Sequence, residues 1–402
     1  MSNPKIIVLI DYYLPGFKAG GPIRSLANMI EWFGDEFEFY VLTSDRDIND
    51  PRPFPGIKQG IWHDVFKAKV MYLTHRQKRW CALRRIFGGL DYDILYLNGS
   101  FPRICINLLI LRRFGLIGNK PTILAPRGEF TKGALALKWF KKKIFLIWAR
   151  NIKLYKDIIW QASSGQEKQD ILAIFGKAIT DQLNSVQIAS DLPSSSIMIA
   201  PNLAESNLLE GEKSQFIKIP NIARIVFISR ISRMKNLDYT LRILKGVKGE
   251  IVFDIYGPIE DGKYWRECQG LIADLPPNVK VTYRGELDSR RVVEVFSTYH
   301  IFFFPTRGEN YGHVIFESLC GGCPVLTSDQ TPWRGLVEKK AGWDLALSKP
   351  EAFQAALNEL IAMDDKEYTH WSTSARAYSD SIISNPNIIE ANRQLFRKVL
   401  KK

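Results

Sequence analysis

The segment Pro305–Thr327 decides the fold, and it reads PTRGENYGHVIFESLCGGCPVLT. An apolar strand, 300–304, precedes it, and a helix that stops at a glycine pair, 321–322, leads to another apolar strand. This strand–loop–helix–strand order is typical of an open α/β sheet. Glu309 is therefore predicted on a loop above the strand ends, where helix N-termini offer free N–H groups to anions such as phosphates. Glu317, one to two turns into the helix, can face the same crevice.

A second segment of the same kind, 228–236, reads ISRISRMKN and also joins an apolar strand, 223–228, to a helix. Arg230 and Lys235 flank this turn. Two permanent cations beside a helix N-terminus suit a diphosphate leaving group, whose negative charge grows as its bond breaks. By itself this segment is better explained as a solvated basic turn, but the two segments together favour an anion site.

The order R-x-x-x-x-K-N followed by E-x-x-G-x-x-x-x-E resembles glycosyltransferase family 4, and the resemblance covers most of the chain. Gly20 and Gly21, which open a predicted helix, 22–32, after strand 5–10, resemble the glycine-rich phosphate-side loop of that family. The resemblance implies the GT-B fold, in which two Rossmann-like α/β domains face each other across a crevice and a C-terminal helix returns to the first domain. It also implies transfer of a sugar from a nucleotide donor with retention of configuration, without a metal or other cofactor.

The resemblance also assigns roles to residues. Arg230 and Lys235 would hold the donor diphosphate, and Glu309 would bind hydroxyls of the donor sugar; these three are the catalytic candidates. Glu317 would hold the nucleotide ribose. The donor-binding candidates implied in this way are Gly21, Asn310, Tyr311, Gly312, His313 and Glu317.

One departure from the family concerns the histidine that many members carry near the anomeric carbon. This chain has Ala-Pro-Arg-Gly-Glu there, 125–129, so Arg127 or Glu129 is expected in that region. A turn after strand 122–125 with a capping charge is the alternative explanation. Arg103 and Arg127, together with Glu129, are the acceptor-side candidates.

The length of 402 residues suits two domains, and 46% hydrophobic residues can supply two cores. Short apolar runs alternate with helical patterns, which favours parallel sheets covered by helices. We expect a first domain over 1–203 and a polar linker over 204–220. A second domain would follow over 221–375, and a helical segment, 376–402, would brace the first domain.

The formal net charge is +13, and much of it lies in the first half, including the stretch 138–156, KWFKKKIFLIWARNIKLYK. Its apolar side chains recur near helical spacing while the cations fall largely elsewhere, as in a helix at a membrane interface. A helix packed into the core with a solvated basic side is the alternative. The interfacial reading predicts peripheral binding to an anionic membrane, and the resemblance adds a glycan or polyprenyl-diphosphate-linked acceptor.

The compartment is predicted from the cysteines and the N-terminus. Five cysteines without a disulfide spacing indicate a reducing cytosol, and the spacing of Cys320 and Cys323 is interpreted as packing rather than redox or zinc chemistry. The N-terminal residues read as a strand rather than a signal, and no run is long and apolar enough to span a membrane. We therefore expect a cytoplasmic protein, peripheral at the inner face of the plasma membrane.

Together these features predict a hexosyltransferase (EC 2.4) of cell-surface polysaccharide or lipopolysaccharide biosynthesis, with a UDP- or GDP-sugar as donor. Two alternatives remain. A pI near 9.4 also suits nucleic-acid binding, although no nucleic-acid-binding module is present and no nucleic acid is expected. The Asp-x-Asp pairs at 91–93 and 45–47 suggest a metal-dependent GT-A transferase, although the first pair leads into a strand from the wrong end.

Overall fold

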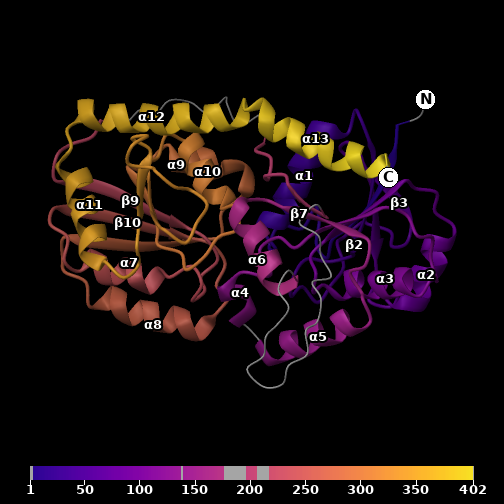
Figure 1. The fold of residues 1–402 in the computed structure, drawn as a ribbon. Coiled ribbons are helices and arrows are strands. Elements are labelled where there is room, and N and C mark those ends of the chain that lie inside the picture. The colour runs from indigo at the N-terminus through magenta and orange to yellow at the C-terminus, as the bar shows by residue number, and fades with distance from the viewer. Residues whose placement is uncertain (1–2, 137–138, 176–195, 206–216, 402) are drawn as a thin grey trace, which may run out of the picture. The chain divides into compact units, whose positions relative to one another are not determined.

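A computed structural model describes residues 3–136, 139–175, 196–205 and 217–401 (Figure 1). The chain divides into two compact units: Met1–Leu203 together with Pro386–Lys402, and Ala204–Asn385. Each unit is built on one twisted sheet with helices on its faces. Residues 206–216 of the predicted linker lie outside the described residues.

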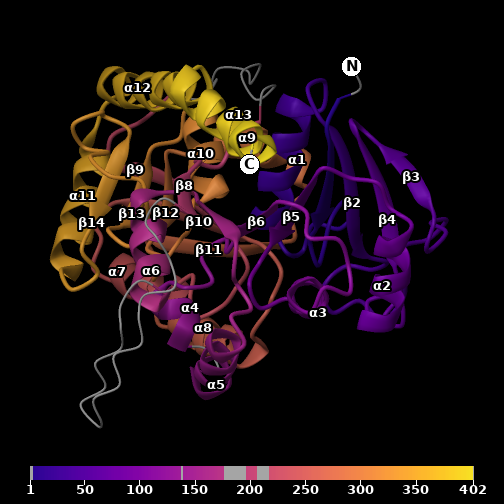
Figure 2. The ribbon, with the colours of Figure 1, turned by 45° about the vertical axis from the view of Figure 1, so that its right-hand side comes forward.

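The first unit contains a sheet in the order β3-β4-β2-β1-β5-β6-β7-β8, and its neighbouring strands are parallel except for the hairpin of β3 and β4 at one edge (Figure 2). Its strands are β1 (Lys5–Leu9), β2 (Glu38–Ser44), β3 (Trp62–Val65), β4 (Ala68–Leu73), β5 (Ile94–Asn98), β6 (Thr122–Ala125), β7 (Ile158–Ala162) and β8 (Ile197–Ile199). Its helices are α1 (Gly21–Phe33), α2 (Trp80–Gly88), α3 (Arg103–Arg113), α4 (Lys132–Ala136), α5 (Trp139–Asn151), α6 (Gly165–Phe175) and α13 (Pro386–Leu400).

Both faces of this sheet are buried, which explains why its strands are continuous apolar runs rather than alternating ones. In β1, Ile7 and Leu9 join the hydrophobic cluster on one face, while Ile6 and Val8 join the cluster on the other. Helix α13 completes the second cluster. The Phe396 ring lies 5.3 Å from Phe37, 6.0 Å from Phe39 and 5.7 Å from Tyr96, measured between ring centroids.

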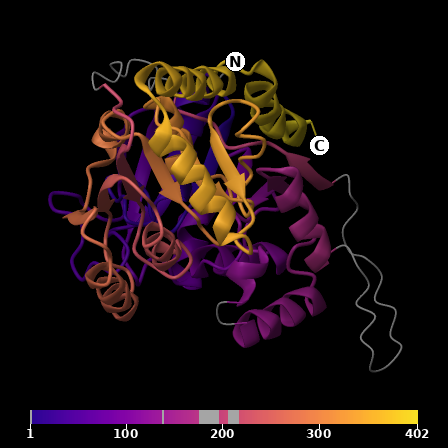
Figure 3. The same cartoon turned by 90° about the vertical axis from the view of Figure 1, so that its left-hand side faces the viewer.

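The second unit contains a parallel sheet in the order β11-β10-β9-β12-β13-β14. Helix α11 packs against β9 and β14, and Figure 3 shows it lying across the sheet. The strands are β9 (Ile222–Ile228), β10 (Glu250–Tyr256), β11 (Val279–Gly285), β12 (Ile301–Phe304), β13 (Val325–Ser328) and β14 (Gly342–Leu345). The helices are α7 (Leu237–Leu244), α8 (Gly262–Ala273), η3 (Ser289–Arg291), α9 (Val292–Phe296), α10 (His313–Cys320), α11 (Pro350–Ala362) and α12 (Asp365–Ile383).

The order of the second sheet positions the site. Strands run outward from β9 in one direction and from β12 in the other, so the topological switch point lies between these two neighbours. In open α/β sheets, ligands bind at the carboxyl ends of the strands at such a point. The loops that leave β9 and β12 at this point contain Arg230, Lys235 and Glu309.

The predicted α/β class with two Rossmann-like domains is confirmed by the two sheets. The tail differs in detail from the predicted segment 376–402, because α12 belongs to the second unit and the chain joins the first unit only from Pro386. No helix among the described residues combines the length and the apolar composition needed to cross a bilayer.

Candidate donor site and the loops that form it

The loop after β9, residues 229–236, is fastened to the end of β10. The Ser229 N–H donates to the Tyr256 carbonyl at 3.0 Å, and the Ile231 N–H donates to the Pro258 carbonyl at 2.9 Å. Gly257 makes this approach possible: its φ is 130°, and a Cβ there would lie 2.0 Å from the Ser229 carbonyl oxygen. Only glycine fits this position, so it fixes the start of the loop that carries Arg230 and Lys235.

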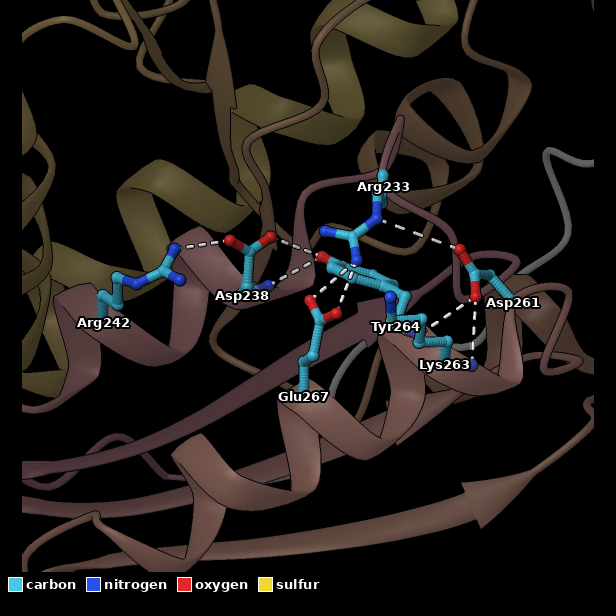
Figure 4. A network of polar contacts seen from close by, with 7 residues as sticks. All are labelled: Arg233, Asp238, Arg242, Asp261, Lys263, Tyr264 and Glu267. Atoms are coloured by element: carbon cyan, nitrogen blue, oxygen red, sulfur yellow. Dashed lines mark hydrogen bonds and ion pairs between the residues drawn. The ribbon is translucent and has the colours of Figure 1, made fainter.

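A polar network holds the same loop from the side of α8 (Figure 4). The Arg233 guanidinium donates to both carboxylate oxygens of Glu267, at 2.6 and 2.8 Å, and lies 5.2 Å from the Tyr264 ring. Asp261 caps α8 by accepting hydrogen bonds from the Lys263 and Tyr264 backbone, both at 3.0 Å. Arg233 is thus anchored on a helix whose first turn is itself fixed.

The network continues from α8 to the start of α7. The Tyr264 hydroxyl donates to Asp238 Oδ1 at 2.5 Å and accepts from the Asp238 N–H at 2.9 Å. Burial, followed by the hydrogen bond to Asp238, raises the pKa of Tyr264, so the phenol stays a neutral donor. Arg242, one turn further along α7, pairs with the same carboxylate. The loop that carries the cations is therefore fixed at both ends.

Asn236 joins the loop after β9 to the loop after β12. It has a left-handed backbone (φ 63°) before α7, and its amide donates to the Pro305 carbonyl at 2.9 Å. Its side-chain oxygen accepts from Arg307 Nε at 3.0 Å, and the Arg307 N–H donates to the Met234 carbonyl at 2.9 Å. These bonds keep the two candidate loops side by side.

The two loops bring Lys235 and Glu309 into an ion pair. Their side chains are only 13% and 14% exposed, and Lys235 Nζ also lies 5.5 Å from the centre of the Phe304 ring. Arg230 is more open, with 39% of its side chain exposed, and pairs with Glu260 at 3.0 Å. The site therefore holds two cations at the switch point, and each has a carboxylate partner.

The loop after β12 leads from Glu309 into the start of α10. Gly312 directly precedes α10 and has a left-handed backbone, with φ 78°. Glycine adopts this conformation without strain, so the backbone turn explains why a glycine occupies this position. The Tyr311 ring lies 4.7 Å from His313 and 5.6 Å from Trp333, between centroids, and the Trp333 indole N–H donates to the Tyr311 carbonyl. Glu317 is buried within α10, at 6% exposure.

The candidates of the first unit lie at the carboxyl edge of its own sheet. Gly21 is the first residue of α1, and Arg103 is the exposed first residue of α3. Arg127 is engaged from three sides: its guanidinium donates to Asn98 Oδ1 at 2.9 and 3.0 Å, to the Tyr96 hydroxyl at 2.6 Å, and to Asn202 Oδ1. Its contacts hold neighbouring strand ends together.

Glu129 is a half-buried cap on the loop before α3. Its carboxylate accepts hydrogen bonds from the backbone N–H groups of Ser100 and Phe101. Burial raises the pKa of Glu129 to about 7, and these two hydrogen bonds oppose the shift. The carboxylate therefore caps the backbone that leads into α3.

Sequence reasoning did not identify Asn236, Arg307, Gly257 and the Arg233–Tyr264 network. Gly257 could have been recognised from the sequence, because Gly-Pro directly after an apolar strand marks a tight turn. Asn236 could have been recognised as well, since Asn tolerates the left-handed backbone before a helix. The network depends on side chains that meet only in three dimensions.

The carboxylate pairs considered for a metal have structural partners. Asp93 accepts from the Lys5 N–H at 2.8 Å and Asp91 pairs with Lys5 Nζ at 3.3 Å, both before β5 and away from the carboxyl edge. Asp47 accepts from the backbone of residues 17 and 18. Within the described parts of the chain, no three His, Cys, Asp or Glu side chains are grouped so that they could hold a metal ion.

The cysteine pair at the end of α10 is packed rather than reactive. Cys320 and Cys323 are free and buried, and burial raises the pKa of each thiol to about 12. A thiol with so high a pKa carries almost no thiolate at neutral pH, and the thiolate is the form that binds metal or exchanges disulfides.

Comparison with known proteins places these features in a class. Residues 212–378 match the family model described as glycosyl transferases group 1. No curated protein matches the chain in a sequence comparison. The match covers the second unit, which contains the loops described above.

Solved structures extend the likeness to the whole chain. HepE from Anabaena, in complex with UDP and glucose, has a TM-score of 0.71 at 15% identity, and the match covers 100% of both chains. WaaG, a glycosyltransferase involved in lipopolysaccharide biosynthesis, has a TM-score of 0.64 at 12% identity, over 95% of this chain and 98% of WaaG. The E. coli trehalose-6-phosphate structure with UDP-2-fluoro glucose has a TM-score of 0.65 at 9% identity, over 99% of both chains.

These likenesses confirm the GT-B fold of two Rossmann-like domains. Together with the group 1 match, they support an enzyme of the glycosyltransferase class, EC 2.4. The nucleic-acid-binding alternative and the metal-dependent GT-A alternative are not favoured.

Proposed function

We propose that this chain is a retaining glycosyltransferase of family 4 that moves a sugar from a UDP- or GDP-sugar to a glycan or polyprenyl-diphosphate-linked acceptor. The process would be the biosynthesis of cell-surface polysaccharide or lipopolysaccharide. One observation carries the proposal: Lys235 pairs with Glu309 across the two loops at the switch point of the second sheet, and Arg230 lies on the same loop as Lys235.

The donor diphosphate would bind to Arg230 and Lys235, because two fixed cations stabilise the charge that develops on the departing nucleotide. Glu309 would accept hydrogen bonds from the sugar hydroxyls, and Glu317 would hold the ribose. Asn310, Tyr311, Gly312 and His313 would line the donor beside the start of α10. HepE, whose structure contains UDP and glucose, supports a nucleotide-sugar donor.

The Lys235–Glu309 ion pair suggests how binding and reactivity are linked. An arriving diphosphate would replace Glu309 as the partner of Lys235, and the released carboxylate would turn to the sugar hydroxyls. Neither charge would be left unpaired in its partly buried position, which would otherwise be costly. We propose no metal or other cofactor, because the two cations can balance the diphosphate charge.

In the transfer step, the bond between the anomeric carbon and the diphosphate oxygen breaks while the acceptor oxygen bonds to the same face of that carbon. The acceptor proton passes to the departing phosphate oxygen, so the products are the glycoside and the nucleoside diphosphate. Gly21, Arg103, Arg127 and Glu129 are the proposed residues of the acceptor-side domain. Arg103 is the exposed cation among them and is the stronger candidate for direct contact.

Thermal unfolding with added nucleotides tests the donor assignment, because a ligand that binds only the native state raises the midpoint. UDP, GDP, ADP, TDP and CMP are compared with and without EDTA, on the native chain and on Arg230→Ala with Lys235→Ala. The matched control is Lys280→Ala with Lys366→Ala, which removes two exposed cations elsewhere in the second unit.

We expect one nucleoside diphosphate to raise the midpoint in the native and control proteins and not in the double variant, with no effect of EDTA. The shift would also name the donor base. An undiminished shift in the Arg230→Ala, Lys235→Ala protein would refute the site, and a shift abolished by EDTA would refute metal-free binding.

A further inference from the structure

Helix α5 exposes its apolar face. Five large apolar side chains along its length remain open to solvent. They are Trp139 (53% exposed), Phe140 (73%), Ile144 (53%), Ile147 (49%) and Trp148 (41%). Isolated exposed apolar residues are common, but a contiguous row of this kind on a folded surface marks an interaction site.

The five residues form one stripe. Because successive residues turn by about 100° around a helix, positions 140, 144, 147 and 148 lie on one side, and 139 borders it. The opposite side packs inward: Leu146 and Ala149 are buried, and the Phe145 ring lies 5.8 Å from Phe101. The contacts of α5 with the core therefore come from a different face of the helix. This rules out the alternative in which the regularly spaced apolar residues serve only to pack the helix into the core.

The helix is shorter than the predicted basic stretch. It ends at Asn151, and Tyr155, which belongs to that basic stretch, packs in the core with its ring 5.2 Å from Trp160 and 5.2 Å from Phe175. The stripe therefore consists only of the five residues 139, 140, 144, 147 and 148, which we call the α5 stripe. In Figures 1 and 2, α5 lies at the outer edge of the first unit.

Positive charge surrounds the stripe. From Lys132 to Lys156 the sequence contains eight Lys or Arg residues and no Asp or Glu. Lys141 and Lys143 are exposed beside the stripe, and neither forms an ion pair with any described residue. Lys143 Nζ lies 5.6 Å from the Trp139 ring, so its charge is held near the apolar residues.

We propose that α5 is an interfacial helix that inserts the α5 stripe into the outer part of a bilayer rich in anionic lipid, while Lys141 and Lys143 contact the headgroups. Apolar and aromatic side chains on one face, flanked by cations, are the combination that such a surface attracts. Tryptophan is well suited to this depth, because its ring is apolar and its N–H is polar. The proposal adds a binding surface and does not depend on the donor site.

Two other occupants are disfavoured. In a symmetric dimer through this helix, the lysines of both copies would face each other, which opposes association. A nucleic acid would pair with the cations but would leave the aliphatic residues Ile144 and Ile147 without an apolar environment. A lipid surface satisfies both components, the apolar stripe and its basic rim.

Cosedimentation with vesicles tests the proposal, using phosphatidylglycerol mixed with phosphatidylcholine against phosphatidylcholine alone at low salt. The apolar variant is Phe140→Ser with Ile144→Ser and Trp148→Ser. Its control is Phe66→Asn, since Phe66 is 85% exposed on the hairpin and its φ of 51° is acceptable to Asn. The charge variant is Lys141→Gln with Lys143→Gln, and its control is Lys366→Gln with Lys398→Gln on α12 and α13.

We expect binding to anionic vesicles to fall roughly thirtyfold in the charge variant, from about fivefold for each lysine near a charged surface. The apolar variant should lose binding to a similar or greater degree, and both controls should bind like the native protein. Binding that is absent in the native protein, or unchanged in the apolar variant, would overturn the proposal. So would a concentration-dependent dimer abolished by the apolar variant, or binding to duplex DNA that competes fully with the vesicles.

The nucleotide-dependent thermal shift is measured on the same variants. A variant that keeps this shift but loses vesicle binding is folded and has an intact donor site, so the failure belongs to α5 alone. A native protein that binds the vesicles but shows no nucleotide shift would instead count against the donor site and leave the α5 proposal standing.

Discussion

Lys235 and Glu309 are 74 residues apart in the sequence, yet they form an ion pair between the loops that leave two adjacent strands. Both side chains are largely withdrawn from water. Pairing at such a position keeps each charge from being buried alone. A ligand that engages either charge therefore competes with this ion pair.

Replacing Glu309 should affect binding and turnover in opposite directions. In Glu309→Gln, Lys235 loses its competing carboxylate, so UDP or GDP should bind several-fold more tightly. Turnover with the nucleotide-sugar should fall by about 2–4 kcal/mol of transition-state stabilisation, because the proposed sugar contact is weakened. Calorimetric titration of nucleotide and initial-rate kinetics measure the two effects, with Asp288→Asn as a control at an exposed ion pair. Weaker nucleotide binding would contradict the exchange of partners.

Lys235→Ala should reduce both properties. The variant removes a cation from the diphosphate and leaves Glu309 without its partner in a mostly buried position. We expect kcat to fall by an amount that corresponds to about 2–4 kcal/mol of lost transition-state stabilisation. Nucleotide affinity should fall as well. Lys235→Arg keeps the charge but not the shape, so it should recover binding more than turnover. A Lys235→Ala enzyme with native kcat would exclude the proposed role.

Gly257→Ala should destabilise the second unit. Its backbone lies in a region that other residues rarely adopt, and the new Cβ would meet the Ser229 carbonyl. We expect a loss of about 2–4 kcal/mol in the free energy of unfolding, together with weaker nucleotide binding. Gly262→Ala is the matched control, because no atom lies within 4 Å of a Cβ at that helical position. It should be neutral or stabilising by up to about 1 kcal/mol. Equal denaturation midpoints for the two variants would show that the close approach is not needed.

Tyr264→Phe tests the network that anchors the cation loop. The change deletes the hydroxyl that donates to Asp238 and accepts from its backbone, while the ring beneath Arg233 remains. We expect about 1–2 kcal/mol of lost stability and a higher KM for the donor, since the loop is less firmly positioned. Tyr368→Phe is the control, because that hydroxyl bonds the Tyr299 carbonyl elsewhere in the unit. The same rise in KM in both variants would show that the effect is general destabilisation.

Glu129 should make the first unit less stable as the pH rises. Its pKa is raised to about 7 in the folded state from an ordinary 4.5, so the folded state binds the proton more tightly than the unfolded state. Its contribution is therefore full below pH 4.5 and is lost between pH 4.5 and 7, by about 3 kcal/mol in total. Urea unfolding across this range, compared with Glu129→Gln, isolates the effect. If the difference between the two proteins is constant with pH, Glu129 does not titrate this way.

Much of the architecture could be predicted because strands buried on both faces are continuous apolar runs, such as 94–98 and 301–304. The hairpin of β3 and β4 was missed, since Trp62–Val65 is short and only half-buried, and its sequence lacks an apolar repeat. Gly312 could be predicted at the mouth of a helix. The hydrogen-bond partners of Arg127 and Glu129 could not be predicted from the sequence, because Asn202 and Ser100 reach them only through the folding of distant segments.

For the basic helix and the donor loops too, local patterns could be predicted but contacts between distant segments could not. Spacing predicted that 138–156 contains an amphipathic helix, but it could not say which face is covered, and the structure exposes the apolar one. The motifs predicted that Lys235 and Glu309 serve one site. Their mutual pairing is a property of the register of β9 against β12, which no local pattern encodes.

Helix α13 gives the protein an order of assembly during translation. Leu395, Phe396 and Val399 belong to the core of the unit whose strands are made first, but the ribosome reaches them only after the whole second unit has been synthesised. Until then, Phe37, Phe39 and Tyr96 lack the Phe396 ring that packs against them, and this part of the core stays incomplete. The second unit can fold earlier, so the part of the chain that emerges first completes its core last.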